Sequence, residues 1–103
     1  MIARIWHGKT LRAKSEAYSD FLQSVAIPDY QRATGFKGLT FLRNASGGEA
    51  HFTLITYWES LEAIGNFAGA DIELAKYYPE DQNFLLEFEE RVIHYEVFAE
   101  VTS

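Results

Sequence analysis

The chain has 103 residues, of which 48% are hydrophobic and 16% aromatic, and this predicts a single domain over residues 1–103 with a packed core. The net charge is −6 and no basic stripe is present, which argues against nucleic-acid binding because clustered Lys and Arg are needed to neutralise phosphates. The lack of cysteine excludes disulfides and cysteine-ligated metals, and the lack of a long apolar segment predicts a cytoplasmic protein that binds no membrane.

The N-terminal region is expected to form a strand and then a helix. Residues 2–7 predict a first strand, which Gly8 closes. Residues 12–26 place apolar side chains at the spacing of one helical face: Tyr18, Phe21, Leu22 and Val25. Pro28 is expected to end this helix, because proline has no amide hydrogen and disfavours helical geometry in the residue before it.

A hairpin and a second helix are expected to follow. Residues 38–43 and 51–58 predict two strands, and the loop at 44–49 between them contains two glycines. A short helix is predicted over 60–68, with Ser60 as its N-cap because the hydroxyl can accept a bond from a first-turn amide.

The C-terminal third is expected to contain one more short helix and the last strand. The helix is predicted over residues 71–78 and should stop before Pro79. Residues 80–90 are ambiguous, because acidic side chains surround a short apolar run. Residues 91–99 predict a strong final strand.

The element order predicts an α+β fold of the ferredoxin-like type, β-α-β-β-α-β, with a four-stranded antiparallel sheet and helices on one face. Neither face of the sheet is convincingly polar. One side of the first strand carries Ala3, Ile5 and His7, and the other carries Ile2, Arg4 and Trp6. Because a sheet that is apolar on both sides needs a cover on both, we expect a homodimer whose sheets pack face to face.

Three segments resemble the antibiotic biosynthesis monooxygenase (ABM) family. They are Trp6-His7 near the end of the first strand, Gly35-Phe36-Lys37-Gly38 before the second, and the junction Thr56-Tyr57-Trp58-Glu59-Ser60 before a short helix. The resemblance covers nearly the whole chain and implies a dimeric α/β barrel. It also implies a cofactor-independent monooxygenase-like activity, with neither metal nor flavin, on a small electron-rich aromatic of the quinol or anthrone type.

Haem binding or degradation is a second activity that the resemblance implies. The haem-degrading type resembles a template with an Asn late in the first strand, a Trp in the helix after the third strand and a His ten residues later. The corresponding positions in this chain are His7, Phe67 and Tyr77, none of which matches. Tyr77 would replace the axial His, and tyrosine is a less usual haem ligand. We therefore expect no cofactor.

His7 is the candidate catalytic residue. We expect its side of the first strand to face the helices, where the family's pocket lies, and a neutral imidazole there could remove a phenolic proton. The alternative is a partly exposed strand-end histidine bonded to backbone. The residues expected to bind substrate are Trp6, Tyr30, Trp58, Phe67, Tyr77 and His94. The spacing of the three histidines carries no metal signature.

Arg4 is unusual because it places a charge within an apolar strand. If it points to the dimer face it needs an acidic partner, and Glu96 on a neighbouring strand is a candidate. Binding of a substrate anion is the second interpretation. No catalytic motif is self-sufficient, so a non-catalytic module that binds a small hydrophobic or aromatic molecule remains the alternative to an enzyme.

Overall fold

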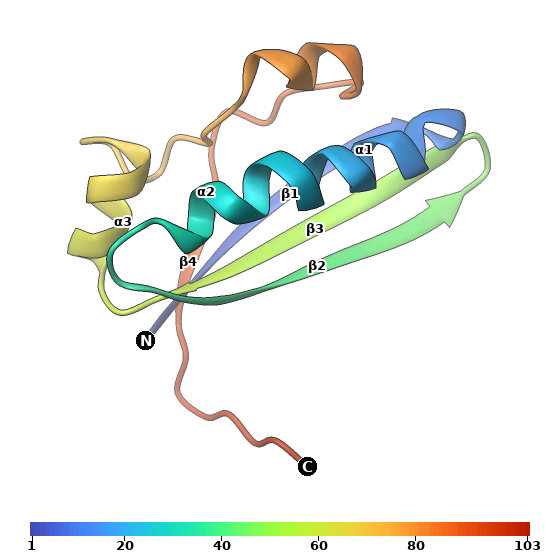
Figure 1. Ribbon diagram of the computed structural model, residues 1–103. Coiled ribbons are helices and arrows are strands. Elements are labelled where there is room, and N and C mark those ends of the chain that lie inside the picture. Colours follow the sequence, from blue (N-terminus) through green and yellow to red (C-terminus); the bar gives the residue numbers. More distant parts are fainter.

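The computed structural model describes residues 1–103 and shows a four-stranded antiparallel sheet with helices on one face (Figure 1). The strand order is β2-β3-β1-β4, which confirms the predicted α+β class and topology. The strands are β1 (Ile2–Leu11), β2 (Phe36–Ser46), β3 (Glu49–Trp58) and β4 (Ile93–Glu96). The helical elements are η1 (Arg12–Lys14), α1 (Ser15–Phe21), the π-helical η2 (Leu22–Ala26), α2 (Ile27–Gln31), α3 (Leu61–Ala68) and the 3-10 helix η3 (Pro79–Asn83).

Strand β1 is longer than predicted, because Gly8 lies inside the strand and does not close it. Gly8 pairs with Phe52 of β3, and the pairing continues to Leu11. The six-membered part of the Trp6 indole lies directly over Gly8, where any side chain would collide with it. A glycine inside a strand often marks such a close approach, and here the approaching group is a large aromatic ring on the same face.

The prediction that Pro28 ends the first helix is wrong. The helical path runs without a break from η1 through α2, and Pro28 lies in the first turn of α2. The preceding turn is π-helical, with the Ile27 amide donating to the Leu22 carbonyl. This wider turn comes directly before the proline, whose ring in a regular α-helix would collide with the carbonyl four residues earlier.

The hairpin and the helix that follows it agree with the sequence. Strands β2 and β3 pair over their full lengths around a turn at Gly47-Gly48. Ser60 caps α3, because its Oγ accepts a bond from the Ala63 amide at 3.1 Å. The helix ends at Gly69, whose φ of 104° suits a residue without a side chain.

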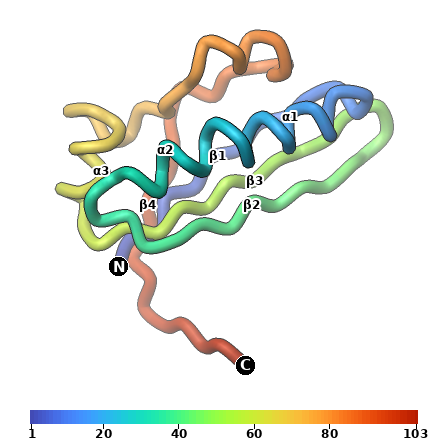
Figure 2. The backbone as a smooth tube through the Cα atoms, in the orientation of Figure 1, coloured from blue at the N-terminus to red at the C-terminus, as the bar shows by residue number.

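Residues 71–78 do not form the predicted helix. Their backbone groups are bonded elsewhere: the carbonyls of Ile72 and Leu74 accept from the Arg4 guanidinium, and the Ala75 amide donates to Glu90. An irregular strap over residues 70–92, which includes η3, therefore crosses the helix-bearing side of the molecule (Figure 2). Strand β4 is also shorter than the predicted 91–99, and the last residues extend away from the body (Figure 1).

The core lies between the helices and one face of the sheet. Trp58 is fully buried there and donates to the Thr56 hydroxyl at 2.8 Å. The other face carries apolar side chains that remain open to solvent, including Ile93 at 55% and Tyr95 at 51% exposure. None of the helices combines the length and the apolar character required to cross a bilayer.

Candidate active site

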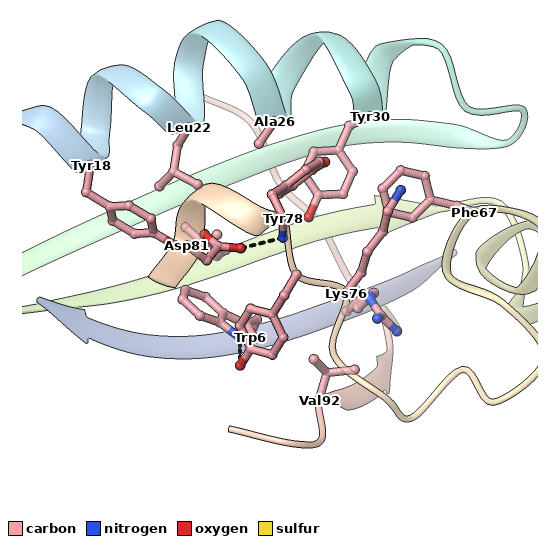
Figure 3. A pocket seen from close by; sticks show the side chains of 13 residues that line it. Trp6, Tyr18, Leu22, Ala26, Tyr30, Phe67, Lys76, Tyr78, Asp81 and Val92 are labelled. Carbon is pink, nitrogen blue, oxygen red and sulfur yellow. Dashed lines mark hydrogen bonds between the residues drawn. The ribbon is translucent and has the colours of Figure 1, made fainter. Parts of the chain in front are cut away.

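A cavity of about 30 Å³ lies between the helices, the sheet and the strap (Figure 3). Arg4 and Trp6 reach it from β1, Tyr30 from α2, and Phe67 from α3. The complete lining is Arg4, Trp6, Tyr18, Leu22, Ala26, Tyr30, Leu54, Phe67, Lys76, Tyr77, Tyr78, Asp81 and Val92. A space of this size holds one or two water molecules, so a larger ligand requires the strap to move.

Two aromatic groups form most of its walls. The rings of Tyr30 and Phe67 stack with centroids 4.9 Å apart, and Trp58 packs behind Phe67 at 5.2 Å. On the other side, Trp6 Nε1 donates to the Tyr77 hydroxyl at 3.0 Å, and that hydroxyl donates to the Glu89 carbonyl. The indole of Trp6 is thereby held against the strap.

Arg4 is the buried cation of the site. Its exposed fraction is 5%, and it donates from Nη1 to the Ile72 carbonyl and from Nη2 to the Leu74 carbonyl at 2.9 Å. Glu96, the expected partner, lies opposite Ile2 in the β1–β4 register and makes no ion pair with Arg4. The prediction that Arg4 points to the dimer face is therefore wrong, because it points toward the helices and the strap.

His94 lies beside the cavity and acts through Arg4. Its Nε2 is 3.0 Å from Arg4 Nη1 and must accept, because a guanidinium has only donors. The proton of the neutral ring is then on Nδ1. Burial, and secondly the positive charge of Arg4, lower the pKa of His94. His94 is thus a neutral acceptor that orients the guanidinium, and it is not among the residues that line the cavity.

Lys76 closes one end of the cavity. Its Nζ lies 3.8 Å from the centroid of the Phe67 ring and 3.1 Å from Asp29 Oδ2. The hydroxyl of Tyr78 donates to the same Asp29 oxygen at 2.6 Å. The Tyr78 hydrogen bond is the main cause that lowers the pKa of Asp29, and Lys76 adds to it. Lys76, Asp29 and Tyr78 form what we call the latch.

Asp81 supplies a buried carboxylate. Its exposed fraction is 3%, and Oδ2 accepts from the Tyr78 amide at 2.6 Å, as Figure 3 shows. Burial raises the pKa of Asp81, so it is a stronger base than an exposed aspartate. The neighbouring phenols stay protonated, since burial raises the pKa of Tyr30 to about 12 and that of Tyr18 further.

The structure does not place His7 at this cavity. Its side chain is exposed on the open face of the sheet, 3.3 Å from the Thr53 hydroxyl. The expectation that the Ala3, Ile5 and His7 side faces the helices is wrong, because that position is taken by the side bearing Arg4 and Trp6. A separate polar hollow of about 150 Å³ contains His7, with Lys9, His51, Glu87 and Glu89.

The other candidate residues divide into two groups. Trp6, Tyr30, Phe67 and Tyr77 line the cavity, while Trp58 is buried in the wall behind it. Lys76 and Asp81 were missed as candidates. Lys76 had the signal of standing directly before the two tyrosines, whereas nothing local marks Asp81 as buried within an acidic segment.

A haem does not fit the residues present. No histidine lines the cavity, and the Tyr77 hydroxyl is already bonded to Trp6 and Glu89. The space is also far smaller than a porphyrin. The chemistry of the site is therefore derived from the protein side chains alone.

Several solved structures share this architecture along nearly the whole chain. A Bacillus cereus protein, provisionally assigned as an antibiotic biosynthesis monooxygenase, is 18% identical with a TM-score of 0.65, covering 99% of this chain and 97% of that one. A Nitrosomonas europaea protein of unknown function is 17% identical with a TM-score of 0.72, covering 99% and 93%. The haem-degrading protein MhuD of Mycobacterium tuberculosis, solved with two haems in its active site, is 21% identical with a TM-score of 0.61, covering 99% and 100%.

These similarities confirm the expected fold, that of ABM and dimeric α/β-barrel proteins. At the level of sequence, no family model and no curated protein matches the chain. Because the solved relatives differ in activity and are distant in sequence, function has to be argued from this chain's own cavity.

Proposed function

We propose that this protein is a cofactor-independent monooxygenase-like enzyme that binds a small electron-rich aromatic, of the quinol or anthrone type, in the cavity beneath the strap. The observation that carries the proposal is the buried carboxylate of Asp81 in a cavity whose walls are aromatic. Stacked rings bind a planar aromatic, and a carboxylate with a raised pKa accepts its proton. Asp81 takes the role that the sequence suggested for His7.

The proposed reaction needs only the substrate and O2. Asp81 accepts a proton from an anthrone methylene, and the resulting anion is electron-rich enough to reduce O2. One oxygen atom becomes the new carbonyl of the product and the other leaves as water, so the methylene supplies all four electrons. The apolar walls bind the ring and exclude bulk water, while Tyr30 and Tyr78 stay protonated as donors because burial raises the pKa of both.

Oxygen consumption tests this proposal. Purified protein is incubated with a hydroxylated anthrone and, separately, with hydroquinones, and O2 uptake is recorded alongside the absorbance of the quinone product. We expect Asp81→Asn, which retains an acceptor for the Tyr78 amide, to lower the rate by about 100-fold or more, as loss of a general base does. Asp20→Asn on the exposed side of α1 removes the same charge and should leave the rate unchanged. Equal rates in wild type and Asp81→Asn would rule out the role of Asp81.

A non-catalytic binding module is the second candidate. One observation favours it: the hydroxyls of Tyr77 and Tyr78 are both engaged within the protein, by Glu89 and Asp29. Such a cavity could hold an aromatic without turning it over. Saturable binding of the anthrone by calorimetry, with no protein-dependent O2 uptake, would select this alternative.

The open face of the sheet leads us to propose a homodimer. Ile5, Ile55 and Ile93 are paired across β3, β1 and β4 on the face that no helix covers. Exposed apolar surface of this kind is typical of a subunit interface. Analytical ultracentrifugation should give twice the chain mass, and Ile93→Asp should give monomers. Leu61→Asp, at an equally exposed position on α3, is the control, and a monomeric wild type at micromolar concentration would refute the dimer.

A further inference from the structure

The charge of Arg4 is not balanced by any carboxylate. No acidic side chain lies within ion-pair distance of its guanidinium, although it is 95% buried. Two carbonyls and the neutral His94 are its partners. Buried charges in proteins are usually paired, because removing an ion from water is costly. Arg4 thus differs from an ordinary structural arginine.

The hydrogen-bond inventory of Arg4 is also incomplete. A guanidinium carries five N–H groups. Nη1 uses both of its hydrogens, on Ile72 and His94, and Nη2 uses one on Leu74, so one Nη2 hydrogen and the Nε hydrogen have no protein acceptor. No fully enclosed polar side-chain atom of this protein lacks a partner, so solvent still reaches Nε. Two donors of a cation that lines the cavity are therefore free for a ligand.

A second cation stands at the end of the cavity. Lys76 and Phe67 line both the inner cavity and an outer, more open pocket of about 570 Å³, which also contains Asp29 and Arg32. An anion entering from the outer pocket meets Arg32 first and Lys76 next. Lys76 is held only by one exposed carboxylate and the face of a ring, so an incoming anion can replace Asp29 as its partner.

Asp81 is the one acidic residue in the lining, and it does not neutralise Arg4. Its Oδ2 is bonded to the Tyr78 amide in η3, and no ion pair joins it to Arg4 or Lys76. The inner cavity therefore has two cations and one anion at its wall. A bound carboxylate would balance this charge.

We propose that the ligand of this site is an aromatic acid: a planar ring between the aromatic walls, with an ionised carboxylate bound by the free N–H groups of Arg4. The inference rests on the proposed function, since it concerns the same cavity, and it names the chemical class that the cavity selects. The ring takes the place over Phe67 that the Lys76 ammonium occupies in the closed latch. Release of Lys76 enlarges the cavity and joins it to the outer pocket.

Three probes separate charge from ring. Calorimetry at neutral pH compares 3-hydroxybenzoate with 3-hydroxybenzamide, which has the same shape but no charge, and with acetate, which has the charge but no ring. We expect the benzoate to bind at least about tenfold more tightly than the amide, as charge-assisted bonds to a buried arginine allow. Acetate should bind more weakly than either. An amide that binds as tightly as the benzoate overturns the proposal, and so does acetate that binds as tightly.

Variants locate the preference. Arg4→Gln should abolish the preference for the benzoate and leave amide binding within about threefold. Because Arg4 also holds the strap, Lys76→Gln provides a variant at a half-exposed position, and it should weaken benzoate binding by a smaller factor. Lys37→Gln, which removes the same charge from an exposed residue without an ion pair, should have no effect. A full preference in Arg4→Gln, or in Lys76→Gln if Arg4→Gln fails to fold, contradicts the proposal.

These measurements require no turnover. Preferential binding of the benzoate without any O2 consumption would support the aromatic-acid site while refuting the monooxygenase. Oxidation of a neutral anthrone by a protein that shows no charge preference would do the reverse.

Discussion

Substitution of Gly8 by alanine tests whether the position of Trp6 defines the cavity. A Cβ at residue 8 would lie 2.5 Å from Cζ2 and 2.9 Å from Cζ3 of the Trp6 ring, and closer still to Cη2. The ring must move by roughly 1 Å to restore ordinary contact, which breaks its hydrogen bond to Tyr77. The φ of Gly8 is outside the left-handed region, so the backbone itself tolerates alanine.

The expected loss of stability combines three effects. Overfilling a packed site costs about 1–3 kcal/mol and a lost hydrogen bond about 1 kcal/mol, while alanine in a strand recovers about 0.5–1 kcal/mol relative to glycine. We expect Gly8→Ala to lower the free energy of unfolding by about 2 kcal/mol in urea denaturation, with a change in the near-ultraviolet circular dichroism of Trp6.

Two controls make the result decisive. Gly48→Ala, in the hairpin turn, meets nothing within 4 Å and also has no positive φ, so it should be nearly neutral. In a Trp6→Leu background the same Gly8→Ala change should cost little, because the ring that it meets is gone. If Gly8→Ala leaves both stability and the spectrum unchanged, or if its cost persists without Trp6, the close approach is not what the position requires.

Three further outcomes follow from individual contacts. Ser60→Ala should lower the free energy of unfolding by about 1 kcal/mol in urea titrations, since it removes the N-cap bond of α3, and an unchanged midpoint would contradict that. The lowered pKa of His94 means that its contribution to stability is complete above about pH 6.5 and declines as the pH falls, because protonation removes the acceptor for Arg4. His94→Gln keeps an acceptor, so its melting temperature should fall less than wild type between pH 7.5 and 5. Tyr78→Phe should raise the pKa of Asp29 in an NMR titration, and a constant value would show that the latch bond is absent in solution.

Local sequence signals were sufficient for most of the secondary structure. The hairpin glycines, the Ser60 cap and the terminating Gly69 each act within a few residues, and the structure has all three features. The same locality explains the errors. Pro28 lies inside a helix because a π-turn precedes it, and Gly8 lies inside a strand because Trp6 covers it.

The candidate site was predicted in part for a related reason. Alternation in β1 correctly separated Arg4 and Trp6 from His7, but both faces of the sheet are apolar, and the pattern does not say which face the helices cover. Choosing the wrong face moved His7 into the cavity and Arg4 out of it. The aromatic residues Tyr30, Phe67 and Tyr77 were unaffected, because they lie on the covering segments and reach the cavity whichever face of β1 is inside.

The amino-acid sequence by itself determined the order of the strands and helices, the antiparallel sheet and the aromatic character of the cavity, since these follow from periodicity, caps and composition. Only the tertiary structure decided the chemistry of the site. The strap over residues 70–92 is irregular because Arg4, about 70 residues earlier in the chain, binds its carbonyls. The same contacts bury Arg4 without a carboxylate and bring Lys76 and Asp81 to one cavity, and such long-range pairing leaves no periodic mark in the sequence.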